Sequence, residues 1–531
     1  MNSNESQATD VGNGAQMQSQ KDQPWLKIGD EEIHILHPLY RLHNSGHYVQ
    51  VQGVLGLTLE SVNRATAVVL ALCDGKRTVA DIARITRPLV KNIADDAKAI
   101  EVAKEKVKRI IFTMSLTAEE RKQQPKLPSP LAGFPAAILI SRAEYDKTFS
   151  RTKFTSMEYH ARDFLPKDSS EMTLPHFYNR HDRTPVNLNW HLTSDCSTDC
   201  RYCYLGRRKV KPMPKERTLA LIEEAAAIGV VGILPTGGDV LLYPYLGDIL
   251  QALCRHKFLP AALCTKSFLS KDKAKVLAEN ASVVLCLQFS IDSTVADVAD
   301  YLVRGKDFCK RIFKSIDNAL EVGLRVEAKA VVTPYNILTI PKLYRDLKKR
   351  GVGTIRLAAY CRSGFHHSDD LFNHTASYQW LEEQTQQLRQ EYPDDLINIQ
   401  NGGPALEPLS PEARQKGWSK RSMCTAGRDS MMICTDGKVI PCEQMPETEE
   451  YFCGDVSHQS IMEVWNGDRL RELTYGIPRE KFKGTACYDC KEWEACCLMG
   501  NCIRDLSYCY GNVYQPPANC PKHNLPYLRM Q

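Results

Sequence analysis

Three cysteines, Cys196, Cys200 and Cys203, stand close enough in the sequence to bind one small metal centre. Their spacing, C-x3-C-x2-C, fits a single short loop that directs three thiolates towards one object. Three thiolates suit a four-iron cubane with one iron left unligated by protein, whereas structural zinc prefers four ligands and a closed site. An iron without a protein ligand can bind a small chelating molecule, so this loop is a candidate catalytic centre.

A second group of cysteines lies near the end of the chain. Eleven of the 20 cysteines fall between Cys424 and Cys520, at short spacings. Such spacings, in a long chain without a signal peptide, indicate metal binding rather than disulfides. A structural zinc domain is the alternative for this region, because the Cys487-x2-Cys490 pair alone would allow it. Single cysteines such as Cys264 lie in apolar surroundings and are expected to be buried thiols.

Composition excludes several classes of protein. The net charge of +5 is small for 531 residues and gives no basis for nucleic-acid binding. No run of about 18 apolar residues exists, so we expect no transmembrane helix and no membrane partner. Residues 1–23 are polar, lack the apolar core of a signal peptide and are expected to form a disordered tail. These features favour a cytoplasmic protein of two to four domains.

The elements that must position the first three cysteines lie in residues 185–365, which form an α/β domain. Apolar runs of strand length alternate there with helical stretches, a pattern typical of parallel β/α units. Six units predict a partial (β/α)6 barrel or a strongly curved sheet. Because the chemistry of such folds lies at the carboxyl ends of the strands, the loop that follows the first strand should place the metal there. The expected strands are 186–193, 230–235, 261–265, 283–291, 325–332 and 354–360, and the expected helices are 217–228, 246–256, 272–278, 308–322 and 340–350.

Residues 24–118 are expected to form a separate winged-helix-like domain. Alternation in 47–52 predicts a strand, and residues 57–59 could form another. Asn63 is a plausible N-cap for a helix up to Leu72, Thr78 opens a second helix, and a third includes residues 107–114. Residues 119–184 are expected to form a linker or bridging region, with a possible strand at 135–140. A connecting region, 366–419, leads to the cysteine-rich domain, 420–531.

The C-x3-C-x2-C loop after a first strand, with Tyr202 before its last cysteine, resembles the radical S-adenosylmethionine (SAM) superfamily. The resemblance implies that Cys196, Cys200 and Cys203 are catalytic and hold a [4Fe–4S] cluster whose open iron binds SAM. One electron splits SAM into methionine and a 5′-deoxyadenosyl radical, which abstracts a hydrogen atom from the substrate. An electron donor such as flavodoxin or ferredoxin is therefore an expected partner.

Other positions match polar motifs of the same superfamily. Gly237-Gly238-Asp239 stands where the family usually has Gly-Gly-Glu. The resemblance implies that the glycines let the backbone approach the ligand and that the acid accepts hydrogen bonds from the SAM ammonium. Asp239 is one methylene shorter than the usual glutamate, which puts its reach in doubt.

The remaining cofactor contacts implied by the resemblance follow later strands. Ser290-x-Asp292 looks like the family's Ser-x-Asp, at the ribose of SAM or in the substrate cavity. Lys329 is similar to a basic residue near the SAM carboxylate. Strand-end polar groups that are satisfied locally are the alternative for both. The expected cofactor-binding residues are Tyr202, Gly237, Gly238, Asp239, Ser290, Asp292 and Lys329.

The C-terminal cysteines resemble the SPASM domain, which is named for subtilosin, pyrroloquinoline quinone, anaerobic sulfatase and mycofactocin maturation. The motif begins with Cys424-x12-Gly437-x4-Cys442. The resemblance implies two auxiliary [4Fe–4S] clusters, in which either Cys496 or Cys497 could be a ligand. Its first cluster has an open iron unless Cys434 or Cys453 completes it. The implied ligands are Cys424, Cys442 and Cys502 for the first cluster and Cys487, Cys490, Cys496 and Cys520 for the second.

The N-terminal domain, 24–118, is similar to the RiPP recognition element, which binds leader peptides by adding them as a strand to a sheet edge. A DNA-binding winged helix is the alternative for it. Together the resemblances predict a radical SAM enzyme that modifies a ribosomally synthesised precursor peptide, by a crosslink, a thioether or epimerisation. The alternatives are a SPASM-type protein maturase, such as an anaerobic sulfatase-maturating enzyme, and a metal-binding winged-helix regulator.

Overall fold

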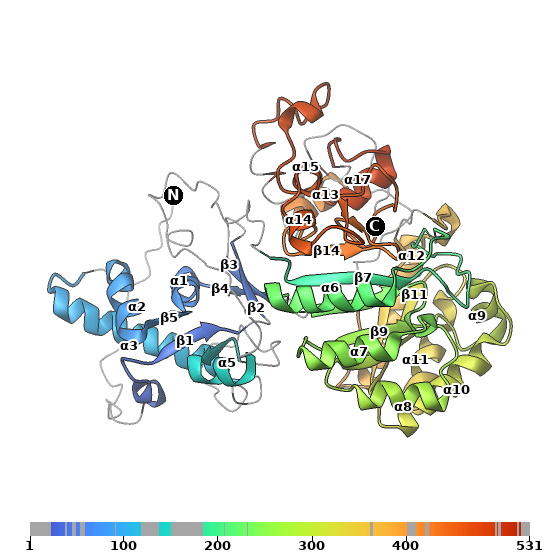
Figure 1. Ribbon diagram of the computed structural model, residues 1–531, viewed down its shortest axis with the longest axis horizontal. Helices are drawn as coiled ribbons and strands as arrows, with labels where there is room; N and C mark the ends of the chain where they lie inside the picture. Colours follow the sequence, from blue (N-terminus) through green and yellow to red (C-terminus); the bar gives the residue numbers. More distant parts are fainter. Residues whose placement is uncertain are drawn as a thin grey trace, which may run out of the picture. The chain divides into compact units, whose positions relative to one another are not determined.

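The structure, a computed structural model, forms two compact units (Figure 1). The first takes in residues 1–42 and 48–147, and the second takes in residues 166–531. The structure describes residues 23–37, 40–44, 49–53, 59–90, 92–117, 120, 137–149, 184–206, 208–230, 232–361, 365–400, 410–419, 424–493, 496–497, 501–517 and 520–521. The tail expected at 1–23 lies almost wholly outside these residues, as does Cys509 as a side chain.

Two small sheets form the strands of the first unit. In one, β1 (Ile33–Leu36) pairs antiparallel with both β5 (Asp74–Thr78) and β6 (Leu139–Ser141). The sequence had suggested a strand at 135–140, and the strand found there belongs to this sheet, beyond the domain boundary expected at 118. The sequence did not predict β1 or β5.

The other sheet of the first unit has the order β2-β3-β4. Its edge strands are β2 (Tyr40–Asn44) and β4 (Leu59–Val62), and β3 (Val49–Gly53) lies between them. The predicted strand at 47–52 overlaps β3. Most of the predicted strand at 57–59 lies outside the described residues.

The three predicted N-terminal helices are present. Asn63 caps α1 (Arg64–Leu72), since its side chain accepts a hydrogen bond from the Thr66 amide at 2.9 Å. Thr78 and Asp81 form a capping box at the start of α2 (Val79–Thr86), where each side chain accepts from the other residue's backbone. The third helix, α3 (Asp96–Ser115), buries Val107, Ile111 and Met114, the stripe that predicted it.

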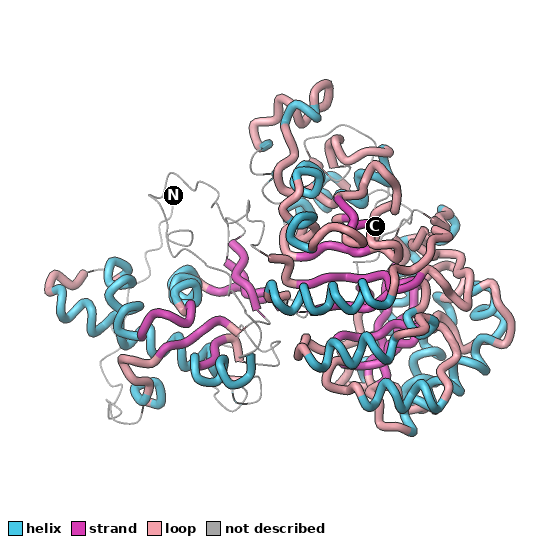
Figure 2. Tube along the Cα trace, in the orientation of Figure 1, coloured by secondary structure: helices cyan, strands magenta, loops and turns pink. Residues whose placement is uncertain are grey.

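The six predicted strands of the second unit are confirmed within about two residues, and the five predicted helices lie between them. In Figure 2 the helices lie outside the strands in the larger unit. Helix α9 was not predicted. The strands are β7 (Asn187–Thr193), β8 (Gly232–Gly237), β9 (Ala261–Thr265), β10 (Val284–Ser290), β11 (Val326–Val332) and β12 (Thr354–Ala359); the helices are α6 (Lys215–Ile228), α7 (Leu246–Arg255), α8 (Lys271–Glu279), α9 (Ala296–Val303), α10 (Phe308–Glu321) and α11 (Ile340–Lys349).

Hydrogen bonds divide these parallel strands into two sheets rather than one ladder. One sheet has the order β13-β12-β11-β10-β9, and the other has the order β16-β15-β14-β7-β8. Strand β14 (Ser430–Ile433), from the cysteine-rich segment, pairs in parallel with β7. The C-terminal segment therefore extends the sheet that carries the Cys196–Cys203 loop, which the sequence did not predict.

Further helices and strands complete the second unit. Between the barrel and the cysteine-rich segment lie α12 (Thr375–Glu391), β13 (Ile399–Gln400) and α13 (Pro411–Ser419). No helix in the described part of the chain is long and apolar enough to cross a membrane. The cysteine-rich segment contributes β14, β15 (Lys438–Ile440), β16 (Gly454–Asp455), α14 (Ile461–Trp465), α15 (Asp468–Leu473) and α17 (Ile503–Tyr510).

Candidate active site

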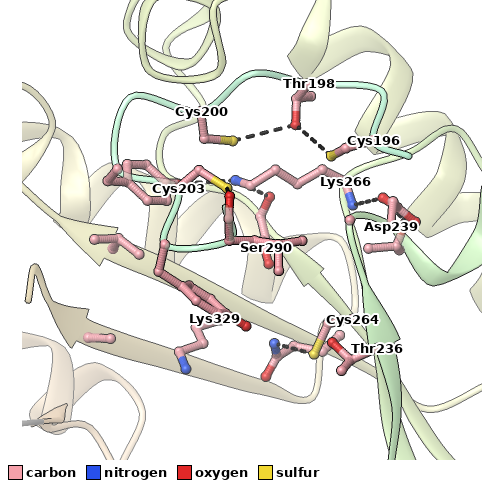
Figure 3. A pocket seen from close by; sticks show the side chains of 18 of the residues that line it. Cys196, Thr198, Cys200, Cys203, Thr236, Asp239, Cys264, Lys266, Ser290 and Lys329 are labelled. Carbon is pink, nitrogen blue, oxygen red and sulfur yellow. Dashed lines mark hydrogen bonds between the residues drawn. The ribbon is translucent and has the colours of Figure 1, made fainter. Parts of the chain in front are cut away.

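A cavity of about 360 Å³ lies at the carboxyl ends of the barrel strands. Its volume is within the range of about 300–1,000 Å³ that is usual for small-molecule sites. Figure 3 shows the three cysteines of the loop on one side and Lys329, Cys264 and Thr236 on the other. Two residues of the C-terminal segment, Glu443 and Gln444, also line it. The cavity is thus formed jointly by the barrel and the cysteine-rich segment.

The cysteine loop presents its thiols towards one side. The hydroxyl of Thr198 lies 3.5 Å from the sulfur of Cys196 and 3.4 Å from that of Cys200 (Figure 3). Three thiolates on one short loop suit a four-iron cubane with one open iron, whereas structural zinc prefers four ligands, so this donor set fits the cubane better than it fits zinc.

Helix α9 holds the outer side of the cysteine loop. Its carbonyls at Leu302 and Val303 accept hydrogen bonds from the Arg201 and Asp199 amides, at 2.9 and 3.1 Å. The guanidinium of Arg201 stacks 3.8 Å from the ring centre of Tyr301. The helix that the sequence missed therefore positions the loop.

His366 also contacts the loop. Its ring lies 2.8 Å from a carboxylate oxygen of Asp199, and its backbone amide donates to the Cys203 carbonyl at 3.0 Å. The sequence had favoured solvated side chains for His366 and His367, in a polar loop, over a position at the mouth of the active site.

Lys266 is a buried cation that sequence reasoning missed. It directly follows β9, and its ammonium donates to the Tyr202 hydroxyl at 2.8 Å and to Asp292 at 3.0 Å. It also donates to the Ser290 carbonyl at 3.0 Å. Burial opposes ionisation, but the Asp292 carboxylate and the Cys200 thiolate outweigh it and raise the pKa of Lys266. Its position after a parallel strand was the only signal in the sequence.

Asp239 lines the cavity, but it is only 2% exposed and protein donors pair its carboxylate. Its carboxylate accepts hydrogen bonds from the Thr265 hydroxyl at 2.8 and 2.9 Å. It also accepts from the amides of Lys266 at 2.8 Å, Ser267 at 2.9 Å and Leu241 at 3.1 Å. Protein donors thus occupy both oxygens, and the shorter acid joins the end of β8 to the end of β9.

The two glycines before Asp239 are required by the protein's own backbone. A Cβ on Gly237 would lie 2.3 Å from the Thr193 carbonyl oxygen, and one on Gly238 would lie 2.2 Å from that of Asp195. Gly237 also has φ +144°, which disfavours a side chain. The motif therefore fits β8 tightly against the segment that leads into the cysteine loop.

The other expected cofactor contacts divide into two groups. Tyr202, Ser290 and Lys329 line the cavity. Asp292 lies outside the cavity lining and is 1% exposed, where it accepts from the Val331 amide at 2.9 Å. Cys264, expected to be a buried structural thiol, is instead on the cavity wall, where the Gln288 amide donates to it at 3.1 Å.

The C-terminal cysteines form two neighbourhoods. Burial and the nearby charge of Cys424 raise the pKa of Cys442. The charge of Cys424 also contributes to the raised pKa of Cys502. Cys434 lies instead among Glu447, Arg208 and Asp436. The three cysteines expected at the first auxiliary cluster therefore stand near one another.

The second neighbourhood surrounds Cys487. Burial is the largest cause that raises the pKa of Cys487, to about 12, followed by Cys496, Cys520 and Cys490. These are the four ligands implied for the second auxiliary cluster. Cys497 also lies close to Cys496 and Cys487, and its carbonyl accepts from Arg428 at 3.0 Å.

An ionic network connects the barrel to the cysteine-rich segment. Arg208, just after the cysteine loop, donates to both oxygens of Asp436, at 2.7 and 2.8 Å, and to Glu447 at 2.8 Å. Glu447 also contacts the ring of His191, in β7, at 3.0 Å. The loop is therefore fixed on one side by α9 and on the other by the C-terminal segment.

Two family models match the chain. Residues 190–347 match the Radical SAM superfamily, and residues 424–491 match SPASM, an iron-sulfur cluster-binding domain. The first match spans the cysteine loop and the strands that form the cavity. The chain is a radical SAM enzyme with a C-terminal SPASM domain, and the cofactors of this class are a [4Fe–4S] cluster, SAM and auxiliary iron–sulfur clusters.

Proteins of similar sequence include a bacteriocin biosynthesis protein and a peptide cyclase. The chain is 23% identical over 299 residues to the antilisterial bacteriocin subtilosin biosynthesis protein AlbA of Bacillus subtilis, which covers 54% of this chain and 61% of AlbA. It is 22% identical over 362 residues to the PqqA peptide cyclase of Gluconobacter oxydans, and this alignment covers 65% of this chain and 93% of the cyclase.

A solved structure shares the fold over most of the chain. Streptococcus suis SuiB, bound to the precursor peptide SuiA, aligns with a TM-score of 0.53 at 15% identity. The alignment covers 89% of this chain and 96% of SuiB. The radical SAM fold with a C-terminal SPASM domain is therefore confirmed.

The expected roles of the cavity residues follow from this fold. Cys196, Cys200 and Cys203 would hold the SAM-binding cluster, which supplies one-electron reduction of SAM when bound. Tyr202, Ser290 and Lys329 line the space beside them. The protein's part is to orient the reactants and exclude water, and the enclosed position of the loop between α9 and the C-terminal segment suits this.

Proposed function

We propose that this enzyme modifies a ribosomally synthesised precursor peptide by radical chemistry at the Cys196–Cys203 cavity. The observation that carries the proposal is the joint wall of that cavity. The barrel supplies Lys329, and the SPASM segment supplies Glu443 and Gln444, directly after Cys442, an expected cluster ligand. AlbA, the PqqA peptide cyclase and SuiB combine peptide maturation with similarity to this chain.

The first unit offers sheet edges at which a leader peptide could add a strand. In the sheet β2-β3-β4, each edge strand has one hydrogen-bonded neighbour among the described strands. Addition of a peptide strand to such an edge supplies backbone hydrogen bonds, and it leaves specificity to the alternate side chains. We therefore assign leader binding to the N-terminal unit and modification to the cavity.

The electron donor, the cellular location and the kind of modification remain predictions. A one-electron donor such as flavodoxin or ferredoxin is needed because the SAM-binding cluster must be reduced. The chemistry places that reaction in a reducing compartment, in line with the cytoplasmic location expected from the sequence. The modification of the peptide is a crosslink, a thioether or an epimerised centre.

The proposal is tested with the reconstituted full chain, SAM, dithionite and the peptide encoded by the short reading frame beside its gene. We expect 5′-deoxyadenosine, together with either a loss of two hydrogens from the peptide or uptake of one solvent deuterium at an epimerised centre. The same peptide without its leader should be modified at least tenfold more slowly. Cys203→Ser should produce neither product.

Other outcomes separate the alternatives. A sulfatase-derived peptide converted to formylglycine, with the precursor peptide untouched, would favour a protein maturase. Equal rates with and without the leader would remove the role of the N-terminal unit. DNA binding without any cleavage of SAM would favour a regulator.

A further inference from the structure

Three side chains form a buried clasp under the cysteine loop: Tyr202, Lys266 and Asp292. Tyr202 belongs to the loop and lies between Cys200 and Cys203 in the sequence. Lys266 follows β9 and Asp292 follows β10, so the clasp joins the loop to two strands. Tyr202 donates a short hydrogen bond to Asp292, and Lys266 donates to both residues, at 2.8 and 3.0 Å.

The clasp is rigidly supported from behind. The second oxygen of Asp292 accepts from the Val331 amide in β11 at 2.9 Å, and its carbonyl accepts from the Asn336 side chain at 2.7 Å. Asp239 fixes the backbone of Lys266, as described above. Two of the three groups that accept from the ammonium, the Ser290 carbonyl and the Asp292 carboxylate, are thus held at the end of β10, and the third, the Tyr202 hydroxyl, belongs to the cysteine loop.

The clasp also places charge beside the thiols. In Figure 3 the side chain of Lys266 extends below Cys196 and Cys200, towards Cys203. The ammonium also lies 5.4 Å from the ring centre of Tyr202 and 5.6 Å from that of Phe308, positions that favour a cation.

We propose that Lys266 and Asp292 are positioning residues that orient the cluster loop through Tyr202 and set the reduction potential of the SAM-binding cluster by their opposed charges. Net charge and hydrogen bonds near an iron–sulfur cluster tune its potential. The side chains of the pair are 11% and 1% exposed, so water screens them little. This inference rests on the assignment of a cluster to this loop but not on the peptide substrate.

The two charges make opposite predictions, which a purely structural role does not. Lys266→Gln removes a cation, so reduction should become harder and the midpoint potential should become more negative. Asp292→Asn removes an anion and should make the potential more positive. Tyr202→Phe and Lys266→Arg keep both charges and should leave the potential close to that of the parent.

The measurement is a redox titration of the reconstituted full chain followed by electron paramagnetic resonance. The cluster in this loop is recognised as the one whose spectrum changes when SAM is added. Lys271→Gln is the matched control. Lys271 lies only five residues after Lys266, and the substitution breaks an exposed ion pair with Glu321. Its potential should equal that of the parent.

Three results would overturn the proposal. They are a shift of the same sign in Lys266→Gln and Asp292→Asn, shifts no larger than that of the Lys271→Gln control, and loss of the cluster from both variants, which would leave only a structural role. Because the readout is a potential, the proposal can fail while peptide modification stands, and peptide modification can fail while the potentials behave as expected.

Discussion

The carboxylate of Asp239 accepts a hydrogen bond from the backbone amide of Lys266 at 2.8 Å. This contact joins the end of β8 to the end of β9, although the hydrogen-bonded ladders of the two sheets do not connect these strands. A side chain here performs the work that a backbone ladder performs elsewhere in the barrel. It also fixes the residue whose ammonium reaches the cysteine loop.

Asp239→Ala should therefore destabilise the protein. The Thr265 hydroxyl and the amides of Lys266 and Ser267 would lose their acceptor, and each buried, unpaired donor costs about 1–3 kcal/mol. We expect the free energy of unfolding, measured by urea denaturation of the cluster-free chain, to fall by at least about 2 kcal/mol. Asp272→Ala, at the exposed start of α8, is the control and should cost less than about 1 kcal/mol. Equal losses would contradict the account.

The cysteine loop should carry one cluster of its own. The parent chain, reconstituted anaerobically, should hold roughly 12 iron atoms if three cubanes form. Cys203→Ser should retain roughly 8 and should lose the signal that responds to SAM. Cys254→Ser changes a thiol that lies near Ser282, outside the cavity, and should keep the full iron content. Full iron in Cys203→Ser would refute the assignment.

Cys496 and Cys497 should differ as ligands of the second auxiliary cluster. After burial, the causes that raise the pKa of Cys487 are the nearby thiols of Cys496, Cys520 and Cys490. We therefore expect Cys496→Ser to lose about four iron atoms and Cys497→Ser to lose none. Iron analysis of the two purified variants decides between them, and the reverse pattern would assign the cluster to Cys497.

The Arg208 network should stabilise the protein at neutral pH and lose its effect in acid. Burial would raise the pKa of Asp436, but hydrogen bonds from Arg208 outweigh it and lower that pKa. Burial would also raise the pKa of Glu447, and there His191 and Arg208 outweigh it and lower the pKa. Groups with a lowered folded-state pKa stabilise above their unfolded values, here 3.8 and 4.5, and lose that contribution as the pH falls through the folded values.

Arg208→Gln tests this network. Breaking a largely buried ion pair costs about 3 kcal/mol, and we expect a loss of that order in urea unfolding at pH 7. The difference from the parent should shrink as the pH falls from the unfolded values, 3.8 and 4.5, through the lower folded values, because both carboxylates become protonated there. A difference that is independent of pH would show that packing, and not charge, accounts for the loss.

Local patterns predicted the six barrel strands and the three helices of the first unit. Apolar runs bounded by turns located the six barrel strands, and the caps at Asn63 and Thr78 located two helix starts. Helix α9 was missed because it is short and its N-cap residue, Val295, makes no side-chain capping hydrogen bond. Strand β5 was missed because its sequence, DGKRT, reads as a turn and is a strand only through its pairing with β1.

The sequence by itself determined the chemistry of this protein, because cysteine spacing specifies a metal centre within a few residues of chain. It could not determine which distant groups surround that centre. Only the tertiary structure brought Lys266 and Asp292 under Tyr202, turned Asp239 towards the end of β9 and placed Glu443 on the cavity wall. The hydrogen bonds among these residues join positions 26 to 90 apart in the sequence. The packing of strand ends, rather than any local pattern, decides them.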